Sequence, residues 1–97
     1  MFLARVVGNV VSTRKADKLV GTKLLVVEAV DFEAQKGEGR HLVAVDAVGA
    51  GEGEVVLVVQ GSSSRLTETT RDAPVDATIM AIVDYIELHG QRTFAKS

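Results

Sequence analysis

Four segments of the chain are dense in Val and Leu and are bounded by Gly, Asp, Ser or Thr, a pattern typical of β-strands. They span residues 2–11, 23–31, 41–48 and 54–60. Many of their side chains are β-branched, and such side chains pack well on a pleated surface. The pattern therefore predicts four strands.

A fifth strand is predicted near the C-terminus. Residues 78–88 are compatible with a helix by composition, but most of their large apolar side chains are β-branched or aromatic. The segment ends in a hairpin pattern, in which Tyr85-Ile86-Glu87-Leu88 is followed by His89-Gly90 and then by Gln91-Arg92-Thr93-Phe94. Gly90 suits the turn, and polar and apolar residues alternate after it. We therefore expect a strand that ends in a C-terminal hairpin.

The connections between these strands indicate the fold class. The connection at 61–76 is long for so small a domain, so we expect a short helical turn at about 63–68, ended by Pro74. Another connection is placed at 32–40. Five short strands with one helical turn before the last strand are typical of a small, partly open OB-like β-barrel. The chain is predicted to be all-β, with residues 1–97 in a single domain.

Two of the predicted strands are apolar on both faces. Leu24-Leu25-Val26-Val27 and the run 55–59 contain no polar alternation. One face fills a barrel, and a continuous apolar run indicates that the other face is covered as well. Hydrophobic residues make up 46% of the chain and aromatic residues 4%, more aliphatic surface than one small core hides. Because the chain has no helices to spare, we expect neighbouring subunits to supply the cover.

Charge and composition exclude several classes of partner. The net charge of −2 gives no basic footprint for nucleic acid, and the chain has no cysteine for a disulfide or thiolate metal site. The longest uncharged apolar stretch, 77–83, is too short for a membrane helix, and the N-terminus lacks the pattern of a secretory signal. We therefore expect a cytoplasmic protein with neither a nucleic acid nor a membrane as partner.

A nucleic-acid-binding barrel is the first alternative to weigh. Five basic residues lie in the N-terminal third, but stacking of bases requires grouped aromatic side chains, and those of this chain are scattered along it. A solvated charged surface fits the pattern better. The residues concerned are Arg5, Arg14, Lys15, Lys18 and Lys23, and the aromatic residues are Phe2, Phe32, Tyr85 and Phe94.

A small enzyme is the second alternative. The segment Gly49-Ala50-Gly51-Glu52-Gly53-Glu54 has the glycines of a phosphate loop, but it leads into a strand and its glutamates repel an anion. The serines of Gly61-Ser62-Ser63-Ser64-Arg65 lack an adjacent base, since only His41 and His89 are available and neither carries a motif. We expect a tight turn in the first segment, and in the second a Ser that caps the helical turn beside an ion-paired Arg65.

Metal and acid–base chemistry have weak support as well. The two histidines are far apart and show no ligand spacing. Asp46 and Asp84 lie inside apolar runs, where a carboxylate more often marks a hydrogen-bonded barrel rim or a subunit interface than an acid–base pair. We therefore predict no catalytic residue, no metal site and no cofactor.

Several sequence motifs resemble those of a known protein family. The chain resembles the EutN/CcmL family of bacterial microcompartment vertex proteins over nearly its whole length, most specifically in Asp46-Ala47-Val48-Gly49-Ala50-Gly51 and in the Gly61-Ser62-Ser63 turn. Ser64 departs from this pattern, because such proteins often carry Ala there, and the loop 32–40 matches weakly. The matching segments are residues 1–15, 21–27, 45–57, 61–65 and 74–84.

The resemblance implies a non-enzymatic shell protein. It implies an OB-like barrel that assembles as a cyclic homopentamer at the vertices of a microcompartment shell, beside hexameric and pseudohexameric facet proteins. It also implies that both small-residue turns lie near the five-fold axis, at Gly49, Ala50, Gly51, Glu52, Gly61, Ser62, Ser63 and Ser64. The candidates for the subunit interface are Val56 or Leu57, whichever faces outward, together with Asp46 and Arg65.

Overall fold

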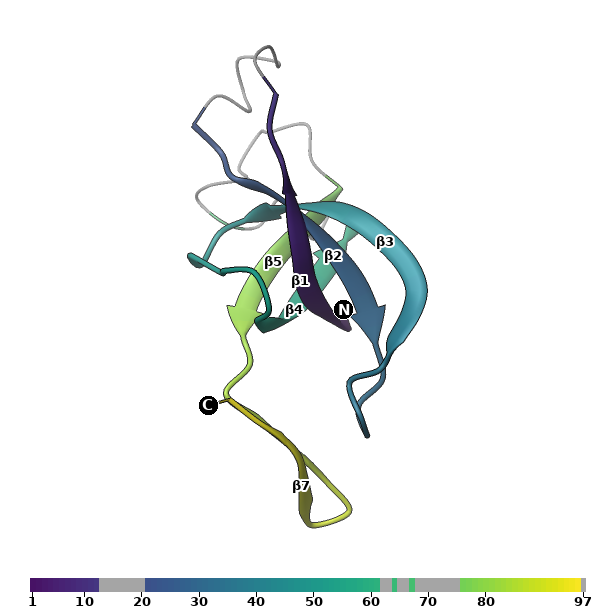
Figure 1. The fold of residues 1–97 in the computed structure, drawn as a ribbon. Helices are drawn as coiled ribbons and strands as arrows, with labels where there is room; N and C mark the ends of the chain where they lie inside the picture. Colours follow the sequence, from purple (N-terminus) through teal and green to yellow (C-terminus); the bar gives the residue numbers. More distant parts are fainter. Residues whose placement is uncertain (13–20, 62–63, 65–66, 68–75, 97) are drawn as a thin grey trace.

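The computed structural model describes residues 1–12, 21–61, 64, 67 and 76–96, and shows an all-β chain (Figure 1). Five strands form a closed barrel in the order β1-β2-β3-β5-β4, and two more form a separate hairpin. The strands are β1 (Phe2–Val10), β2 (Leu24–Val30), β3 (Gly37–Asp46), β4 (Val55–Gln60), β5 (Ala77–Ile82), β6 (Tyr85–Leu88) and β7 (Gln91–Ala95).

The barrel is closed by a short parallel pairing. β1 pairs antiparallel with both β2 and β4, β2 with β3, and β4 with β5. The circle is completed where β3 meets β5 in parallel, through the pairs Val45↔Thr78 and Asp46↔Ile79. The sequence predicts a partly open barrel, and the structure has a closed one because these two residue pairs join the edges.

The third strand begins earlier than the sequence predicts. Gly37 and Gly39 indicate a loop up to residue 40, yet β3 starts at Gly37, which pairs with Val30. The pairing with β2 accounts for the difference: a Cβ at Gly37 would meet the Glu28 carboxylate, and the Gly39 amide donates to its Oε2 at 3.0 Å. Gly37 thus leaves room for the Glu28 side chain, and Gly39 supplies a φ of 80°, so neither glycine interrupts the strand.

The apolar segment 78–88 contains two strands instead of one. β5 ends at Ile82 and β6 begins at Tyr85, so the chain leaves the barrel at Val83 and Asp84. The hairpin is confirmed, with β6 and β7 paired antiparallel across His89 and Gly90, which have φ values of 54° and 79°. Positive φ at both central residues suits the right-handed twist of a two-residue hairpin.

The core fills the interior of the barrel. Side chains from all five barrel strands meet there, and most of them are fully buried. Because side chains alternate along a strand, every second residue of β1, β2 and β4 contributes. The cluster consists of Ala4, Val6, Leu25, Val27, Ala44, Ala50, Val56, Val58, Ala77 and Ile79, with Phe2, Leu42 and Ile82 packed against it.

A second apolar cluster lies on the outside of the barrel, under the hairpin. Leu3, Val30 and Val55 are buried there, because Val83, Ile86 and Phe94 pack over them together with Leu57. The hairpin is fastened by the Lys96–Glu54 ion pair (2.7 Å) and by the bond from Thr93 Oγ1 to the Phe32 carbonyl (2.6 Å). The hairpin therefore covers the outward side of β4 only at Val55 and beside Leu57, and the expectation that neighbouring subunits cover the remainder of the doubly apolar strands stays a prediction.

Two further observations complete the fold. The predicted helical turn at 63–68 falls largely outside the described residues; within them, Gly61 and Ser64 have 3₁₀ conformation, and Ser64 Oγ donates to the Gly61 carbonyl at 2.6 Å. In the described part of the chain, no helix has the length and apolar character needed to cross a membrane.

Candidate functional site

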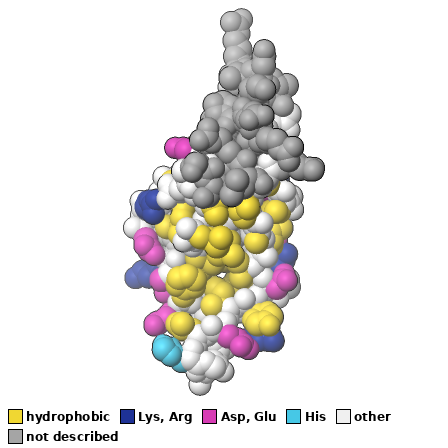
Figure 2. All heavy atoms as spheres, turned by 180° about the vertical axis from the view of Figure 1, so that it is seen from behind, with side chains coloured by type: hydrophobic (Ala, Val, Ile, Leu, Met, Phe, Trp, Pro, Cys, Tyr) yellow, Lys and Arg dark blue, Asp and Glu magenta, His cyan; other side chains and the backbone are white. Residues whose placement is uncertain are grey.

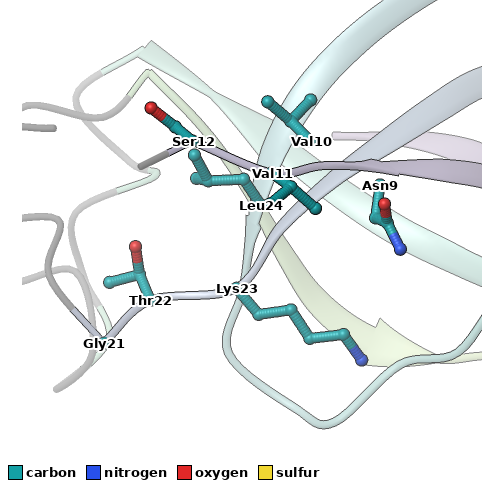
Figure 3. A pocket seen from close by; sticks show the side chains of 8 residues that line it. All are labelled: Asn9, Val10, Val11, Ser12, Gly21, Thr22, Lys23 and Leu24. Atoms are coloured by element: carbon teal, nitrogen blue, oxygen red, sulfur yellow. The ribbon is translucent and has the colours of Figure 1, made fainter. Parts of the chain in front are cut away.

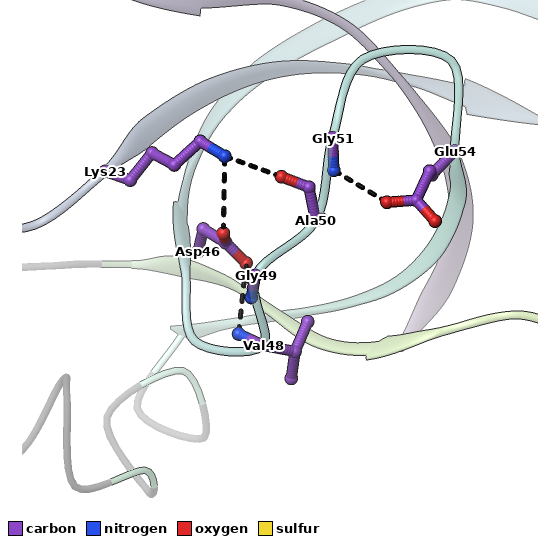
Figure 4. Close-up of polar contacts among 7 residues, drawn as sticks. All are labelled: Lys23, Asp46, Val48, Gly49, Ala50, Gly51 and Glu54. Atoms are coloured by element: carbon purple, nitrogen blue, oxygen red, sulfur yellow. Dashed lines mark hydrogen bonds and ion pairs between the residues drawn. The ribbon is translucent and has the colours of Figure 1, made fainter.

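The loop between β3 and β4 contains the most specific sequence motif and is organised by Asp46 (Figure 4). Oδ1 of Asp46 accepts hydrogen bonds from the amides of Val48 and Gly49, at 3.0 and 3.1 Å. Its Oδ2 lies 3.9 Å from Lys23 Nζ. The Asp46 side chain is almost fully buried, so this carboxylate is a structural support for the turn and does not project into solvent.

Two more charged residues hold the loop from either side (Figure 4). Lys23 donates from Nζ to the Ala50 carbonyl at 2.7 Å, and Glu54 Oε1 accepts from the Gly51 amide at 2.7 Å. The other oxygen of Glu54 accepts from Lys96 at 2.7 Å. The hydrogen bonds that Glu54 accepts from Lys96 and from the Gly51 amide lower the pKa of Glu54, and the bond that Lys96 donates to Glu54 raises the pKa of Lys96.

This bonding pattern decides against an anion site. A phosphate loop aims its backbone amides at the ligand. Here the amides of Val48, Gly49 and Gly51 already donate to carboxylates, and the Gly53 amide donates to the Val6 carbonyl at 2.8 Å. These amides therefore hold the loop in its conformation and are not directed at a ligand.

The loop consists mainly of small residues, and its backbone is tightly bent. Ala50 is fully buried in the barrel core, whereas Glu52 is exposed at the tip. Gly49 and Gly53 have φ values of 81° and 89°, which side chains with a Cβ rarely adopt. Nothing within 4 Å would meet a Cβ at either glycine, so backbone conformation, not space within the chain, requires glycine here.

The second predicted turn is only partly described. Gly61 has φ 69°, and its amide donates to the Asp76 carbonyl at 2.8 Å. Ser64 is fully buried, and its carbonyl accepts from Thr78 Oγ1 at 2.6 Å, so the turn is fastened to β5. Ser62, Ser63 and Arg65 lie outside the described residues.

The structure separates the two candidates on β4. Val56 is fully buried in the barrel core, where it pairs with Ala4 and Ile82. Leu57 faces outward with its neighbour Ala81 and is half-buried at the border of the outer cluster. Val56 is therefore not available to a neighbouring subunit, and Leu57 is the outward residue of the pair.

The titratable groups that the structure describes do not converge on a catalytic centre. His41 Nε2 lies 3.9 Å from Glu28 Oε1, whereas His89 occupies the hairpin turn at the other end of the chain. Asp46 shapes its loop, and the Asp84 backbone carbonyl accepts from the Lys96 amide at 2.7 Å. Among the described residues, no three His, Cys, Asp or Glu side chains form a group that could hold a metal ion.

A pocket at the ends of β1 and β2 has no catalytic features either (Figure 3). Asn9, Ser12 and Thr22 supply its polar groups, and Lys23 is its single charged residue among those described. The Lys23 side chain extends away from both hydroxyls, toward the Ala50 carbonyl. The lining residues that the structure describes include no carboxylate and no histidine that could act as a base for a nucleophile.

Sequence reasoning missed several residues that organise the site. Lys23, Glu54 and Lys96 all support the loop or the hairpin, although their positions in the sequence are far apart. Lys23 could have been found, because it begins a strand whose neighbour ends at Asp46, and the Asp46 amide donates to the Lys23 carbonyl at 2.9 Å. Lys96 carries no such signal, since only the fold of the hairpin brings it to Glu54.

The described part of the chain therefore has the features of a structural, assembling protein. Its distinctive motif builds a rigid small-residue loop, and its charged residues support that loop instead of lining a reactive cleft. Comparison with known proteins agrees with this class. Residues 1–84 match the family model described as "Ethanolamine utilisation protein EutN/carboxysome".

Two relatives illustrate the match. The microcompartment shell vertex protein GrpN of Rhodospirillum rubrum is 46% identical over 87 residues, covering 90% of this chain and 97% of GrpN. The structure of GrpN, a pentameric shell protein, matches with a TM-score of 0.80 at 45% identity, over 91% of this chain and 98% of that one. The structure of CcmL from Nostoc sp. PCC 7120 matches with a TM-score of 0.93 at 40% identity, over 99% and 100%.

The chain belongs to the EutN/CcmL family. It is a structural shell vertex protein of bacterial microcompartments and not an enzyme. The match to the family model ends at Asp84, so the hairpin of β6 and β7 lies beyond the part that the model covers.

Proposed function

We propose that five copies of this chain form a closed ring that caps each vertex of a polyhedral microcompartment shell, between hexameric and pseudohexameric facet proteins. The observation that carries the proposal is the similarity to GrpN, a pentameric shell protein whose length this chain covers almost completely. A cyclic ring uses two different faces of each subunit, and the rotation between neighbours sets the number of copies.

Geometry explains why a ring of five is useful in a shell. Hexameric units tile a plane, and a plane does not close. Replacing a hexagon by a pentagon introduces curvature, so the task of the vertex protein is mechanical. The absence of a convergent catalytic group among the described residues agrees with this task.

The surface of the subunit supports assembly. Figure 2 shows the face turned away from the viewer of Figure 1: apolar side chains gather at its centre, and charged side chains lie along its edges. An apolar centre with a polar rim is typical of a protein interface. On β4, Leu57 is the outward residue that such an interface can use, and Asp46 contributes by holding the shape of the adjacent loop.

We place the small-residue turns near the five-fold axis. Gly49–Glu52 forms a hydrogen-bonded loop whose residues are small except for Glu52 at its tip, and Gly61 opens a second turn with positive φ. Small residues let several backbones approach closely. Ser62, Ser63, Ser64 and Arg65 belong to the same part of the sequence, with Ser64 at the barrel and Arg65 in the interface.

The mass of the native assembly tests the proposal most directly. Native mass spectrometry of the purified chain is expected to give five subunits, or ten if two rings stack. A chain that is monomeric at all concentrations tested would contradict the ring and with it the vertex function.

A deletion in the source organism tests the function in the cell. Facet proteins and enclosed enzymes are expected to be made in normal amounts and to keep their activity, while electron microscopy shows elongated, open or leaking shells. Intact polyhedra that lack one enzymatic step would instead indicate a catalytic or cargo-related role.

A further inference from the structure

The loop between β3 and β4 is held at two places by two different carboxylates (Figure 4). Asp46 accepts from the amides of Val48 and Gly49, at 3.0 and 3.1 Å. Glu54 accepts from the amide of Gly51 at 2.7 Å. We call residues 48–49 the first half of the loop and residues 51–52 its second half. The two halves are supported from different parts of the fold.

A different element stands behind each carboxylate. Asp46 Oδ2 lies 3.9 Å from Nζ of Lys23, which precedes β2. Glu54 Oε2 accepts from Nζ of Lys96 at 2.7 Å, and Lys96 belongs to the hairpin because its amide donates to the Asp84 carbonyl at 2.7 Å. Glu54 therefore joins the loop to the hairpin through the two oxygens of one carboxylate.

The hairpin projects from one end of the barrel (Figure 1) and meets it along a seam that side chains fill only in part. Ile86 and Phe94 are half-buried against the outer cluster. Beside the Lys96–Glu54 contact, a hollow of about 320 Å³ is lined by Arg5 of β1 and by the end of the hairpin. A two-stranded hairpin is marginally stable on its own in water, and such elements open locally while the rest of a fold stays closed. The hairpin can therefore leave the barrel without unfolding it.

We infer that the hairpin is a strap, and that its closure sets the second half of the loop through Glu54. With the strap closed, Lys96 fixes one oxygen of the carboxylate, and the other oxygen is directed at the Gly51 amide. With the strap open, the carboxylate turns toward water and the Gly51 amide loses a fixed, charge-assisted acceptor. The coupling is reciprocal, so a displacement of Gly51 also favours opening of the strap.

The change is confined to the second half of the loop. Lys23 holds the Ala50 carbonyl at 2.7 Å, just before Gly51. After the tip, the Gly53 amide donates to the Val6 carbonyl of β1 at 2.8 Å. Opening of the strap therefore loosens the backbone between these two supports, while the first half keeps its bonds.

This coupling is a property of the single chain, but its consequence for the shell rests on the proposed function. That proposal places Gly49–Glu52 near the five-fold axis. In such a ring, the state of the hairpin is transmitted to the backbone beside the axis. A wild-type chain that is monomeric would refute the ring and leave the strap as it is, so the two failures are distinguishable.

Amide hydrogen exchange, followed by NMR with all variants in the same subunit state, tests the strap. Lys96→Met removes the charge and keeps an unbranched side chain. The Gly51 amide is then expected to exchange about threefold faster, the size of effect that an exposed ion pair supports. The amides of Val48 and Gly49 are expected to keep their rates. Lys96→Arg is expected to restore the wild-type rate at Gly51, because it retains a charged donor.

A second variant opens the strap and leaves both charges in place. Phe94→Ala removes an apolar contact with the outer cluster, and is expected to accelerate exchange at Gly51 at least about fivefold relative to Val48 and Gly49. Asp46→Asn is the matched control, because it weakens the carboxylate of the first half. With this control, the amides of Val48 and Gly49 are expected to exchange faster, and those of Gly51 and β7 are expected to keep their rates.

The inference holds if Gly51, alone among these three loop amides, responds to both hairpin variants. It is wrong if Gly51 responds to neither variant. A response to Lys96→Met alone would be a local effect of charge, and a response to Phe94→Ala alone would mean that Glu54 is not the link; either result overturns the strap. Equal acceleration of all three amides would overturn it as well, because the variant would then have lost stability throughout the chain.

Discussion

The two doubly apolar segments of this chain have the same sequence pattern and different surroundings. The run in β4 sends Val56 and Val58 into the barrel, and at the start of the run the hairpin covers the outward Val55 through Phe94 and Ile86. The run in β2 sends Leu25 and Val27 into the barrel, and its outer side stays partly exposed with Val26. A continuous apolar run thus indicates that both faces of a strand are covered, but not by which chain.

The largest expected effect comes from the inner side of β4. Val56→Asp places an unpaired carboxylate in a fully buried position and is expected to cost about 4 kcal/mol or more, enough to unfold a small domain. Urea titration followed by circular dichroism measures the loss. Leu57→Asp, on the outer side of the same strand, is the comparison and is expected to cost less in the single chain. Equal losses would contradict the inward and outward assignment.

A smaller effect is expected from the cover that the chain supplies itself. Phe94→Ala removes an aromatic side chain that packs on Leu3, Val30 and Val55, and is expected to destabilise the chain by about 2 kcal/mol because the side chain is only partly buried. Tyr85→Ala is the control, since Tyr85 is 52% exposed and stacks mainly on Arg92. Its expected cost is below about 1 kcal/mol. Chemical denaturation measures both losses. If Tyr85→Ala costs more than Phe94→Ala, the apolar contact of Phe94 is not what holds the hairpin.

The smallest effect concerns the ion pair that fastens the hairpin. The pKa of Glu54 is lowered in the folded chain, so the Lys96–Glu54 pair stabilises the hairpin above the ordinary pKa of a glutamate and is lost as the pH falls through the lowered value. Amide hydrogen exchange of β7 is therefore expected to accelerate, beyond its intrinsic pH dependence, on acidification below about pH 4.5.

A conservative variant isolates this pair. Glu54→Gln keeps an acceptor for the Gly51 amide and removes the charge that Lys96 requires. It is expected to remove the extra acid dependence of exchange in β7 and to leave that of β2 unchanged. An unaltered acid dependence would assign the effect to another carboxylate.

Most of the fold could be predicted from short-range patterns. Residues 2–11, 23–31 and 54–60 are confirmed as strands to within one or two residues at each end, and the hairpin at His89-Gly90 is confirmed as well. These elements depend on side-chain alternation, β-branching and turn glycines, which act between residues close in the chain. The motif at 46–51 was singled out for the same reason, because a tight turn leaves a local signature.

The errors share a different cause. The start of β3 depends on the pairing of Gly37 with Val30 of β2, and just past the end of β5 the Val83 amide donates to the Val55 carbonyl of β4 at 2.8 Å. Both contacts are made with a residue of another strand. Local pattern does not record which strand lies beside which, so these boundaries could not be derived from the sequence.

The sequence by itself determined the all-β class, the strand count of the barrel, the apolar character of both faces of β2 and β4, and membership of the EutN/CcmL family. These properties follow from local preference and from motifs of neighbouring residues. The tertiary structure alone decided that Val56 points inward and that Lys23, Asp46 and Glu54 fix the loop. It also decided that the hairpin packs on the outer cluster around Val55, while Val26 and Val43 remain accessible. The physical reason is that burial and charge pairing depend on distances in space, which strand pairing sets only when the barrel closes.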